Sequence, residues 1–227
     1  MKKFLFNQLI KILLYPAPTV LITKEEEKQF INILENGINS DRELEYSIEI
    51  PKYKFLYYLT KEKNIVLHGS NHKTIQQFEP REQTLFNNET VKAVFATKDP
   101  IWPMFYAILN KENIVDNFRN GCLRGKGRNY HFYSLTKETV EKDPWMDGML
   151  YLLPSENFSL VGKGPVSFDE WISYEYVKPI AKIQIQPKDF YFINKVSTHN
   201  INESLIKTWF LYKIRTILKK IAPNHSK

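Results

Sequence analysis

The chain has 227 residues, a length that suits one domain with helical additions. Plentiful aromatic residues and scarce glycine exclude a disordered chain, and the single cysteine, Cys122, excludes an internal disulfide. One cysteine fits a reducing compartment, so we expect a cytoplasmic protein. The formal net charge of +7 favours nucleic acid, phosphorylated ligands or an anionic membrane face as partners, although a basic proteome also yields basic proteins.

The N-terminal segment resembles a secretory signal only at its first residues. Residues 1–6 are basic and then apolar, but Asn7, Gln8 and Lys11 interrupt the apolar run, and no small-residue cleavage site follows. Helical spacing of the apolar residues predicts a helix over 3–14. No run in the chain approaches the roughly 20 apolar residues that span a bilayer.

A second helix is predicted from about 24 to 35. Thr23 and Glu26 have the spacing of a capping box, and Gly37 is expected to end the helix. The two helices together form the N-terminal part of the predicted single domain, 1–40 of 1–227.

Strand patterns dominate the section from about 44 to 193, the predicted core. Leu, Tyr and Ile alternate with Glu and Ser over 44–50, which predicts a strand, while 55–59 fits a strand or a short helix. Further strands are predicted at 65–67, 92–96, 131–135, 149–153, 159–162, 170–174 and 180–185.

Two other segments interrupt these strands. Thr97 or Asp99 can cap a helix that has Pro100 in its first turn and an apolar body at 104–109. Residues 119–129 hold three glycines and four basic residues, which predicts a flexible basic loop or a hairpin.

The chain closes with a basic helix at 203–221. Its lysines and apolar residues could dock on an anionic membrane or on nucleic acid. We expect instead that its apolar face packs on the core, with the first helix as a neighbour.

The run 65–70 ends in His68, Gly69 and Ser70, at the end of an apolar strand. An uncharged imidazole can donate a hydrogen bond to a ribose hydroxyl from one nitrogen, and glycine lets a flat ring approach the backbone because no side chain intervenes. Ser70 can hold the turn. Taken alone, the tripeptide is more often an ordinary strand-end histidine followed by a turn glycine.

Glu170 opens a second strand-like run about a hundred residues later. A carboxylate there could accept from a 2′-hydroxyl and stabilise positive charge developing on a sugar ring. A solvated strand-end acid is the simpler explanation for Glu170 alone. Together, His68 and Glu170 could hold a ribose from two sides.

A third block, 94–97, leads into the helix that carries Phe105 and Tyr106. These aromatic side chains could stack on a ligand ring. Aromatic residues at such positions are more often part of the core.

In this order the three blocks resemble the ADP-ribosyltransferase fold, in its diphtheria-toxin-like and poly(ADP-ribose) polymerase branch, over about 65–190. The branch has a His-Tyr-Glu triad. Its first motif, a strand followed by His-Gly-Ser or His-Gly-Thr, matches 67–70, and its last, Glu-aromatic-aliphatic-x-Tyr, matches 170–174. Phe-Ala of the middle motif matches 95–96. The chain departs from the branch at Val94, where the branch has a tyrosine that stacks on nicotinamide.

The resemblance implies an α+β fold with split antiparallel sheets and flanking N-terminal and C-terminal helices. It implies NAD as the substrate that donates ADP-ribose to a protein, a nucleic acid or water. Gly69 would orient the carboxamide by its backbone, His68 would hold the adenosine-side ribose, and Glu170 would hold the nicotinamide-side ribose and stabilise the cation. Ser70, Val94, Phe105 and Tyr106 would lie at the cofactor, and Arg81 would face the adenosine half or the pyrophosphate.

Two other functions remain open on the sequence. A catalytically inactive module of the same fold would bind a nucleotide or an ADP-ribose-like ligand, and Val94 favours it. A nucleic-acid-associated basic protein is the third, and the basic cluster at 119–128 also keeps an RNA 2′-phosphotransferase open. The histidines are too scattered to predict a metal site, 125–127 lacks the P-loop spacing, and Cys122 belongs to no nucleophile motif.

Overall fold

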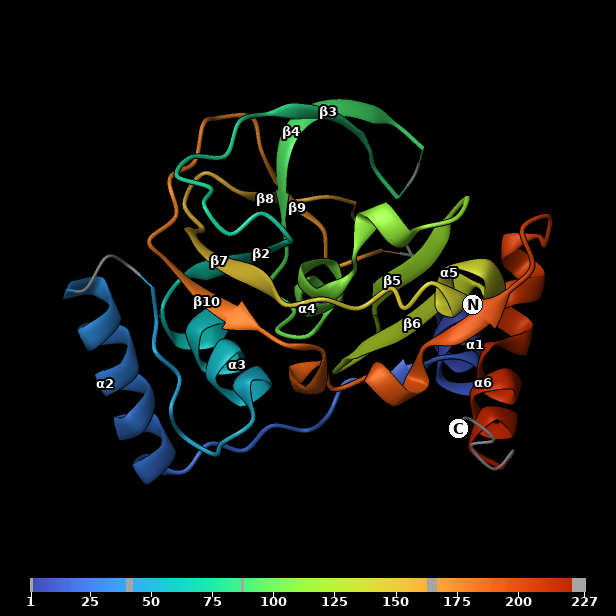
Figure 1. The fold of residues 1–227 in the computed structure, drawn as a ribbon, viewed down its shortest axis with the longest axis horizontal. Helices are drawn as coiled ribbons and strands as arrows, with labels where there is room; N and C mark the ends of the chain where they lie inside the picture. Colours follow the sequence, from blue (N-terminus) through green and yellow to red (C-terminus); the bar gives the residue numbers. More distant parts are fainter. Residues whose placement is uncertain (1, 40–42, 87, 163–166, 222–227) are drawn as a thin grey trace. The chain divides into compact units, whose positions relative to one another are not determined.

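The computed structural model describes residues 2–39, 43–86, 88–162 and 167–221 and has a mixed α+β architecture (Figure 1). Its chain divides into two compact units. Unit 1 is built from 1–17, 110–144 and 192–227, and unit 2 from 18–109 and 145–191. Unit 1 therefore takes strands from inside the predicted 44–193 core and combines them with both terminal helices.

The sheet of unit 1 is organised around β6. Strand β5 pairs antiparallel along one edge of β6, while β1 (antiparallel) and β11 (parallel) share its other edge. The elements of this unit are α1 (Lys2–Leu13), β1 (Tyr15–Pro16), β5 (Phe118–Arg124), β6 (Asn129–Thr136), α5 (Lys137–Glu141), β11 (Ser197–His199) and α6 (Leu205–Ile221), with short 3-10 turns at Lys111–Asn113 and Ile193–Lys195.

The glycine-rich basic segment is a hairpin that joins β5 to β6. Gly125 donates its amide to the carbonyl of Arg128 (3.0 Å), and Gly127 has φ +83°, a conformation that glycine adopts without strain. The hairpin alternative for 119–129 is therefore the correct one.

A buried histidine in unit 1 gives that unit a specific pH dependence. His199 Nε2 donates to Asn117 Oδ1 (2.9 Å) and its Nδ1 accepts from Ser134 Oγ (2.8 Å). Burial, with the nearby Arg119 charge, lowers the pKa of His199 to about 4.

Because an unfolded chain protonates this histidine near its ordinary pKa, we expect about 3 kcal/mol of stability to be lost as pH falls from 6.5 to 4. Urea unfolding across this range measures the loss. His199→Gln should flatten that part of the pH profile, whereas His72→Gln, at an exposed histidine, should leave it unchanged. Equal slopes in the wild type and His199→Gln would contradict the assignment.

Unit 2 contains two small antiparallel sheets. One has the order β10-β7-β2 and the other β3-β4-β9-β8. The elements are α2 (Lys24–Asn39), α3 (Lys52–Glu62), β2 (Ile65–Ser70), β3 (Arg81–Thr84), β4 (Thr90–Ala96), α4 (Trp102–Ile108), β7 (Gly148–Pro154), β8 (Ser159–Leu160), β9 (Trp171–Ser173) and β10 (Ala181–Ile185), with a 3-10 turn at Pro187–Asp189.

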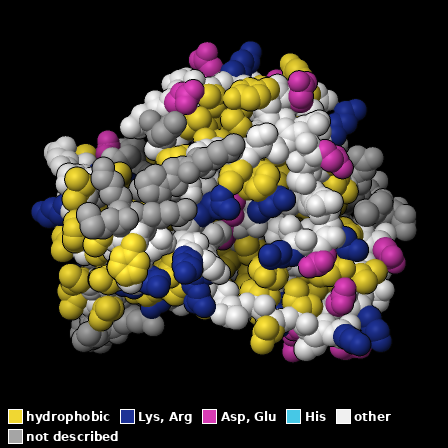
Figure 2. All heavy atoms as spheres, turned by 180° about the vertical axis from the view of Figure 1, so that it is seen from behind, with side chains coloured by type: hydrophobic (Ala, Val, Ile, Leu, Met, Phe, Trp, Pro, Cys, Tyr) yellow, Lys and Arg dark blue, Asp and Glu magenta, His cyan; other side chains and the backbone are white. Residues whose placement is uncertain are grey.

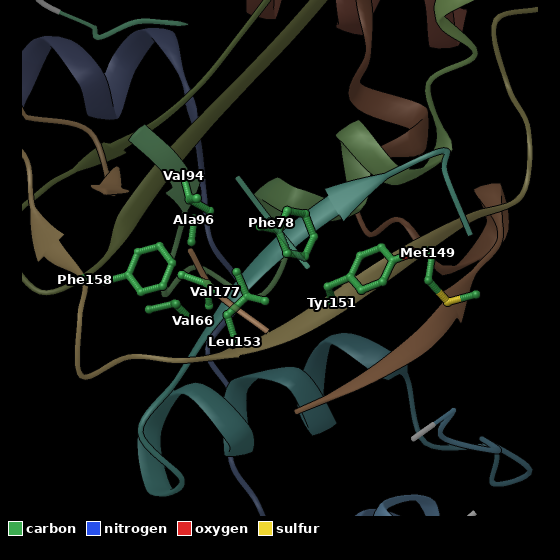
Figure 3. Packing of buried hydrophobic residues seen from close by; sticks show 9 residues of the cluster. All are labelled: Val66, Phe78, Val94, Ala96, Met149, Tyr151, Leu153, Phe158 and Val177. Atoms are coloured by element: carbon green, nitrogen blue, oxygen red, sulfur yellow. The ribbon is translucent and has the colours of Figure 1, made fainter. Parts of the chain in front are cut away.

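One bridge joins the two sheets. Leu67 of β2 and Thr97, directly after β4, exchange both backbone hydrogen bonds (2.8 and 3.0 Å). A hydrophobic cluster then fills the space beside β2, β4 and β7 (Figure 3). Its buried members are Val66, Phe78, Val94, Ala96, Met149, Tyr151, Leu153, Phe158 and Val177.

Several local predictions are confirmed. Thr23 and Glu26 exchange the two hydrogen bonds of a capping box (2.8 and 3.2 Å) at the start of α2. Asp99 Oδ1 accepts from the amides of Ile101 and Trp102 at the start of α4 (2.9 and 2.8 Å). Helix α4 begins only at Trp102, however, so Pro103 is in its first turn in place of the predicted Pro100. The predicted strands at 65–67, 92–96, 131–135, 149–153 and 180–185 all form.

Three predictions about local structure are wrong. Residues 44–50 form no strand, because beyond the Glu43–Lys182 bridge and the Leu44 amide bond to Lys182 no neighbouring strand pairs with them. Helix α2 continues through Gly37 to Asn39. A β-carbon at Gly37 would lie 2.0 Å from the side chain of Leu44, so that glycine admits a close contact and does not end the helix.

The third error is partial and concerns α6: α1 is its neighbour as expected, but most of the apolar face that was expected to pack on the core is exposed. Its buried positions include Thr208, Tyr212 and Thr216, whereas Phe210 and Ile214 are exposed. Trp209 and Tyr212 pack on Phe132 of β6 (ring centroids 5.6 and 5.9 Å). Tyr15 Oη also lies 2.7 Å from Thr216 Oγ1, so aromatic packing and polar contacts hold this helix to its own unit. None of the described helices has the length and apolarity that crossing a membrane requires.

Candidate functional site

The backbone of Gly69 is at an unpaired strand edge in the part of the chain that the structure describes. Strand β2 pairs with β7 on one side only, with Gly69 opposite Leu150. Leu67 directs its N–H and C=O away from β7, toward Thr97, and backbone groups two residues apart in a strand point to the same side. The N–H and C=O of Gly69 therefore also point away from β7, just beyond the place where β2 separates from β4.

Helix α4 packs closely on this glycine (Figure 1). A β-carbon at Gly69 would lie 1.8 Å from the carbonyl oxygen of Pro103, and one at Gly148 would lie 1.7 Å from that of Ala107. These two glycines let α4 lie against β2 and β7. The absence of a side chain at Gly69 thus allows the helix to pack closely. The N–H and C=O of Gly69 still point away from β7.

The residue before Gly69, His68, connects β2 to β4 through its side chain. Its Nδ1 lies 2.7 Å from the carbonyl oxygen of Phe95, and its ring centroid lies 4.6 Å from that of Phe78. A carbonyl oxygen only accepts, so Nδ1 is the donor and Nε2 of the neutral ring is an acceptor. A ribose hydroxyl would therefore have to donate to Nε2, which is the reverse of the polarity considered from the sequence.

Ser70 is buried and supports the turn that follows β2. Its Oγ accepts from the amide of His72 (3.1 Å). This contact fixes the end of the strand without presenting the hydroxyl to the Gly69 edge.

Glu170 directly precedes β9 and is half-buried. Its Oε2 accepts from the amide of Phe86 (3.3 Å), and burial raises the pKa of its carboxyl group above the ordinary value. Ala96 pairs with Trp171, and continuing this register by one residue places Glu170 opposite Thr97, which in turn pairs with Leu67. Glu170 and Leu67 are thus two strand spacings apart, about 10 Å.

His68 and Glu170 approach the end of β4 from its two faces. The His68 ring packs on Phe78, within the cluster that also contains Val94 and Ala96 (Figure 3). Trp171 packs against the same cluster, and because side chains alternate along a strand, Glu170 lies on the opposite face. The antiparallel register of the Leu67–Thr97 bridge places Gly69 level with Phe95. A ligand on the Gly69 edge that touches both side chains must therefore reach from one face of β4 to the other.

The three residues that the resemblance places around the nicotinamide ring, Val94, Phe105 and Tyr106, are mostly buried. Val94 is 3% exposed and Phe105 is fully buried, with its ring against Trp145 and Phe190. Tyr106 is half-buried, beside Trp102 on the same helix. Of these residues, only Tyr106 keeps part of its side chain accessible to solvent.

Sequence reasoning missed two phenylalanines near the carboxylate. Phe86, whose amide donates to Glu170, stacks on Phe168 with ring centroids 5.2 Å apart, and Phe168 is 6.2 Å from Trp102. An aromatic row therefore extends from α4 to Glu170. Neither residue belongs to a periodic pattern, and the adjacency of Phe168 to the Asp-Glu pair was the one available signal.

Arg81 is exposed at the first position of β3, opposite Ala93. The neighbouring acid, Asp169, is buried and accepts from Trp171 Nε1 (2.7 Å) through Oδ1. Of the predicted residues, His68, Gly69 and Glu170 lie around the end of β4, Tyr106 lies on the helix that covers Gly69, and Val94 and Phe105 lie in the core.

Comparisons with protein-family models, with curated proteins and with solved structures found no significant match for this chain.

Proposed function

We propose that this chain is an ADP-ribosyltransferase-like protein that cleaves the nicotinamide–ribose bond of NAD and transfers ADP-ribose to an acceptor. The observation that carries the proposal is the strand edge at Gly69, where one N–H and one C=O point away from β7 next to His68. A primary carboxamide offers the complementary pair, a carbonyl that accepts and an NH₂ that donates.

The sheet arrangement of unit 2 supports the fold in this proposal. Two small antiparallel sheets meet at the Leu67–Thr97 bridge and separate beyond it, which agrees with split sheets. The Gly69 edge lies at that separation. The resemblance of 67–70 and 170–174 to the family motifs remains the reason to choose NAD over other carboxamides.

Each residue has a defined task in the proposed reaction. Gly69 would hold the nicotinamide carboxamide, and Nε2 of His68 would accept from the adenosine-side ribose on the other face of β4. Glu170 would accept from the nicotinamide-side 2′-hydroxyl and stabilise the oxocarbenium-like charge as the bond between nicotinamide nitrogen and C1′ breaks. Water or an acceptor nucleophile then bonds to C1′ and releases its proton.

The test is incubation of the purified protein with labelled NAD and chromatographic measurement of free nicotinamide over time. Turnover that is lost in Glu170→Gln supports the enzyme. Unchanged NAD, with no effect of NAD on the melting temperature, contradicts any NAD-based function.

A binding module of the same kind is the second candidate. The burial of Val94 and Phe105 favours it, because it leaves Tyr106 as the only predicted stacking aromatic with exposed surface. Stabilisation by NAD or ADP-ribose without nicotinamide release would support the module over the enzyme.

A further inference from the structure

Helix α6 exposes a continuous apolar stripe. Ile206, Phe210, Ile214 and Ile217 follow each other at helical spacing, and each is more than half exposed. The opposite side of the helix is attached to the sheet: the Tyr212 ring lies 5.9 Å from that of Phe132 in β6, and Arg215 donates to the carbonyl of Thr198 in β11 (2.9 Å). The apolar stripe is therefore not needed to hold α6 in unit 1.

Helix α1 lies beside α6 and exposes a similar stripe. Leu5 and Ile12 are 60% and 68% exposed, whereas Ile10 on the other side of the helix is buried. Lys213 Nζ donates to the carbonyl of Lys11 (2.9 Å), which ties the two helices together. Figure 2 shows hydrophobic side chains gathered with lysine and arginine side chains over this part of unit 1.

The charge of the two helices has one sign. Neither α1 nor α6 contains an aspartate or glutamate, and Lys11 and Lys207 are exposed beside the apolar stripes. Lysine next to exposed Phe, Leu and Ile on a helix is the composition of a segment that lies in the interface of an anionic bilayer. No described helix has the character of a membrane span, so the helices would lie on the bilayer.

We infer that α1 and α6 together form a surface that binds anionic phospholipid bilayers through their apolar stripes and flanking lysines. A bilayer fits better than a second copy of the chain, because pairing two such surfaces would bring lysines together without acids to neutralise them. It also fits better than nucleic acid, which would neutralise the lysines but leave the isoleucines exposed. This surface is independent of the NAD proposal.

The test is flotation of the full chain with vesicles of phosphatidylcholine plus phosphatidylserine, and with vesicles of phosphatidylcholine alone. We expect binding to the anionic vesicles only, weakened by added salt. Ile206→Asn combined with Ile214→Asn should weaken it at least about tenfold, and Lys11→Gln or Lys207→Gln about fivefold each.

Leu21→Asn is the matched control, since Leu21 is 78% exposed but lies outside both helices. It should bind vesicles like the wild type. Because all replaced side chains are exposed, circular dichroism and melting temperature should be unchanged in every variant. Absence of binding to anionic vesicles, or equal binding by the double variant, overturns the proposal. The proposal is also overturned if the protein does not bind vesicles but forms a dimer or binds RNA, and the double variant loses that association.

Discussion

Glu170→Gln should lower nicotinamide release from NAD by about 100- to 1,000-fold without weakening the fold. The rate falls because a neutral amide cannot stabilise the positive charge that develops on the ribose, a contribution of about 3–4 kcal/mol in comparable electrostatic sites. Stability should be equal or greater. Burial raises the pKa of Glu170, which means that the folded state disfavours the carboxylate at neutral pH, and glutamine removes this cost.

The amide oxygen of glutamine can still accept from the Phe86 amide, so the surroundings of position 170 should be preserved. Glu175→Gln is the matched control, because Glu175 is exposed five residues further along the chain. Nicotinamide release is measured by chromatography and stability by thermal unfolding. A Glu170→Gln protein that keeps most of the wild-type rate would show that this carboxylate is not catalytic.

Glu203→Ala should cost about 3 kcal/mol of folding free energy. The Glu203 carboxylate is buried and accepts from both terminal nitrogens of Arg215 and from Thr208 Oγ1 (2.9 Å). Hydrogen bonding by Arg215 lowers the pKa of Glu203 to about 2. The variant would leave the guanidinium without its carboxylate partner, next to buried Thr208.

The loss should depend on pH in a defined way. A carboxyl group whose pKa is depressed in the folded state stabilises the protein above its ordinary pKa of 4.5 and loses this contribution as pH falls toward 2. Urea unfolding at neutral pH measures the full difference between the wild type and Glu203→Ala, which should shrink below pH 4.5. Glu141→Ala, at an exposed carboxylate of the same unit, should change stability by less than about 0.5 kcal/mol. A comparable small change in Glu203→Ala would contradict the role of the ion pair.

The sequence correctly predicted those helices and strands whose positions depend on residues close by in the chain. Alternation and apolar runs predicted β2, β4 and β7, and the capping residue Thr23 predicted where α2 begins, while the predicted start of α4 was about two residues too early. These features depend on neighbours within a few positions along the chain.

The predictions that failed concern segments whose surroundings are formed by residues far away in the sequence. The 44–50 segment alternates in exposure, yet no strand lies beside most of it. Periodicity identified the apolar face of α6 but not that this face stays exposed, because Tyr212 and Arg215 attach the helix to the sheet from its other side. The candidate site shows the same division: the motifs located His68, Gly69 and Glu170, while the stacking of Phe86 on Phe168 arises only from tertiary packing.

The Gly69 amide offers the most direct test of the proposed site. In nitrogen-15 labelled protein, titration with nicotinamide or NAD should shift the Gly69 amide resonance, because its N–H changes from a strand edge to a donor for the carboxamide oxygen. The Leu21 amide, away from the edge, should stay in place. Saturation of the protein with NAD while the Gly69 resonance does not move, or no binding of either ligand, would contradict the site.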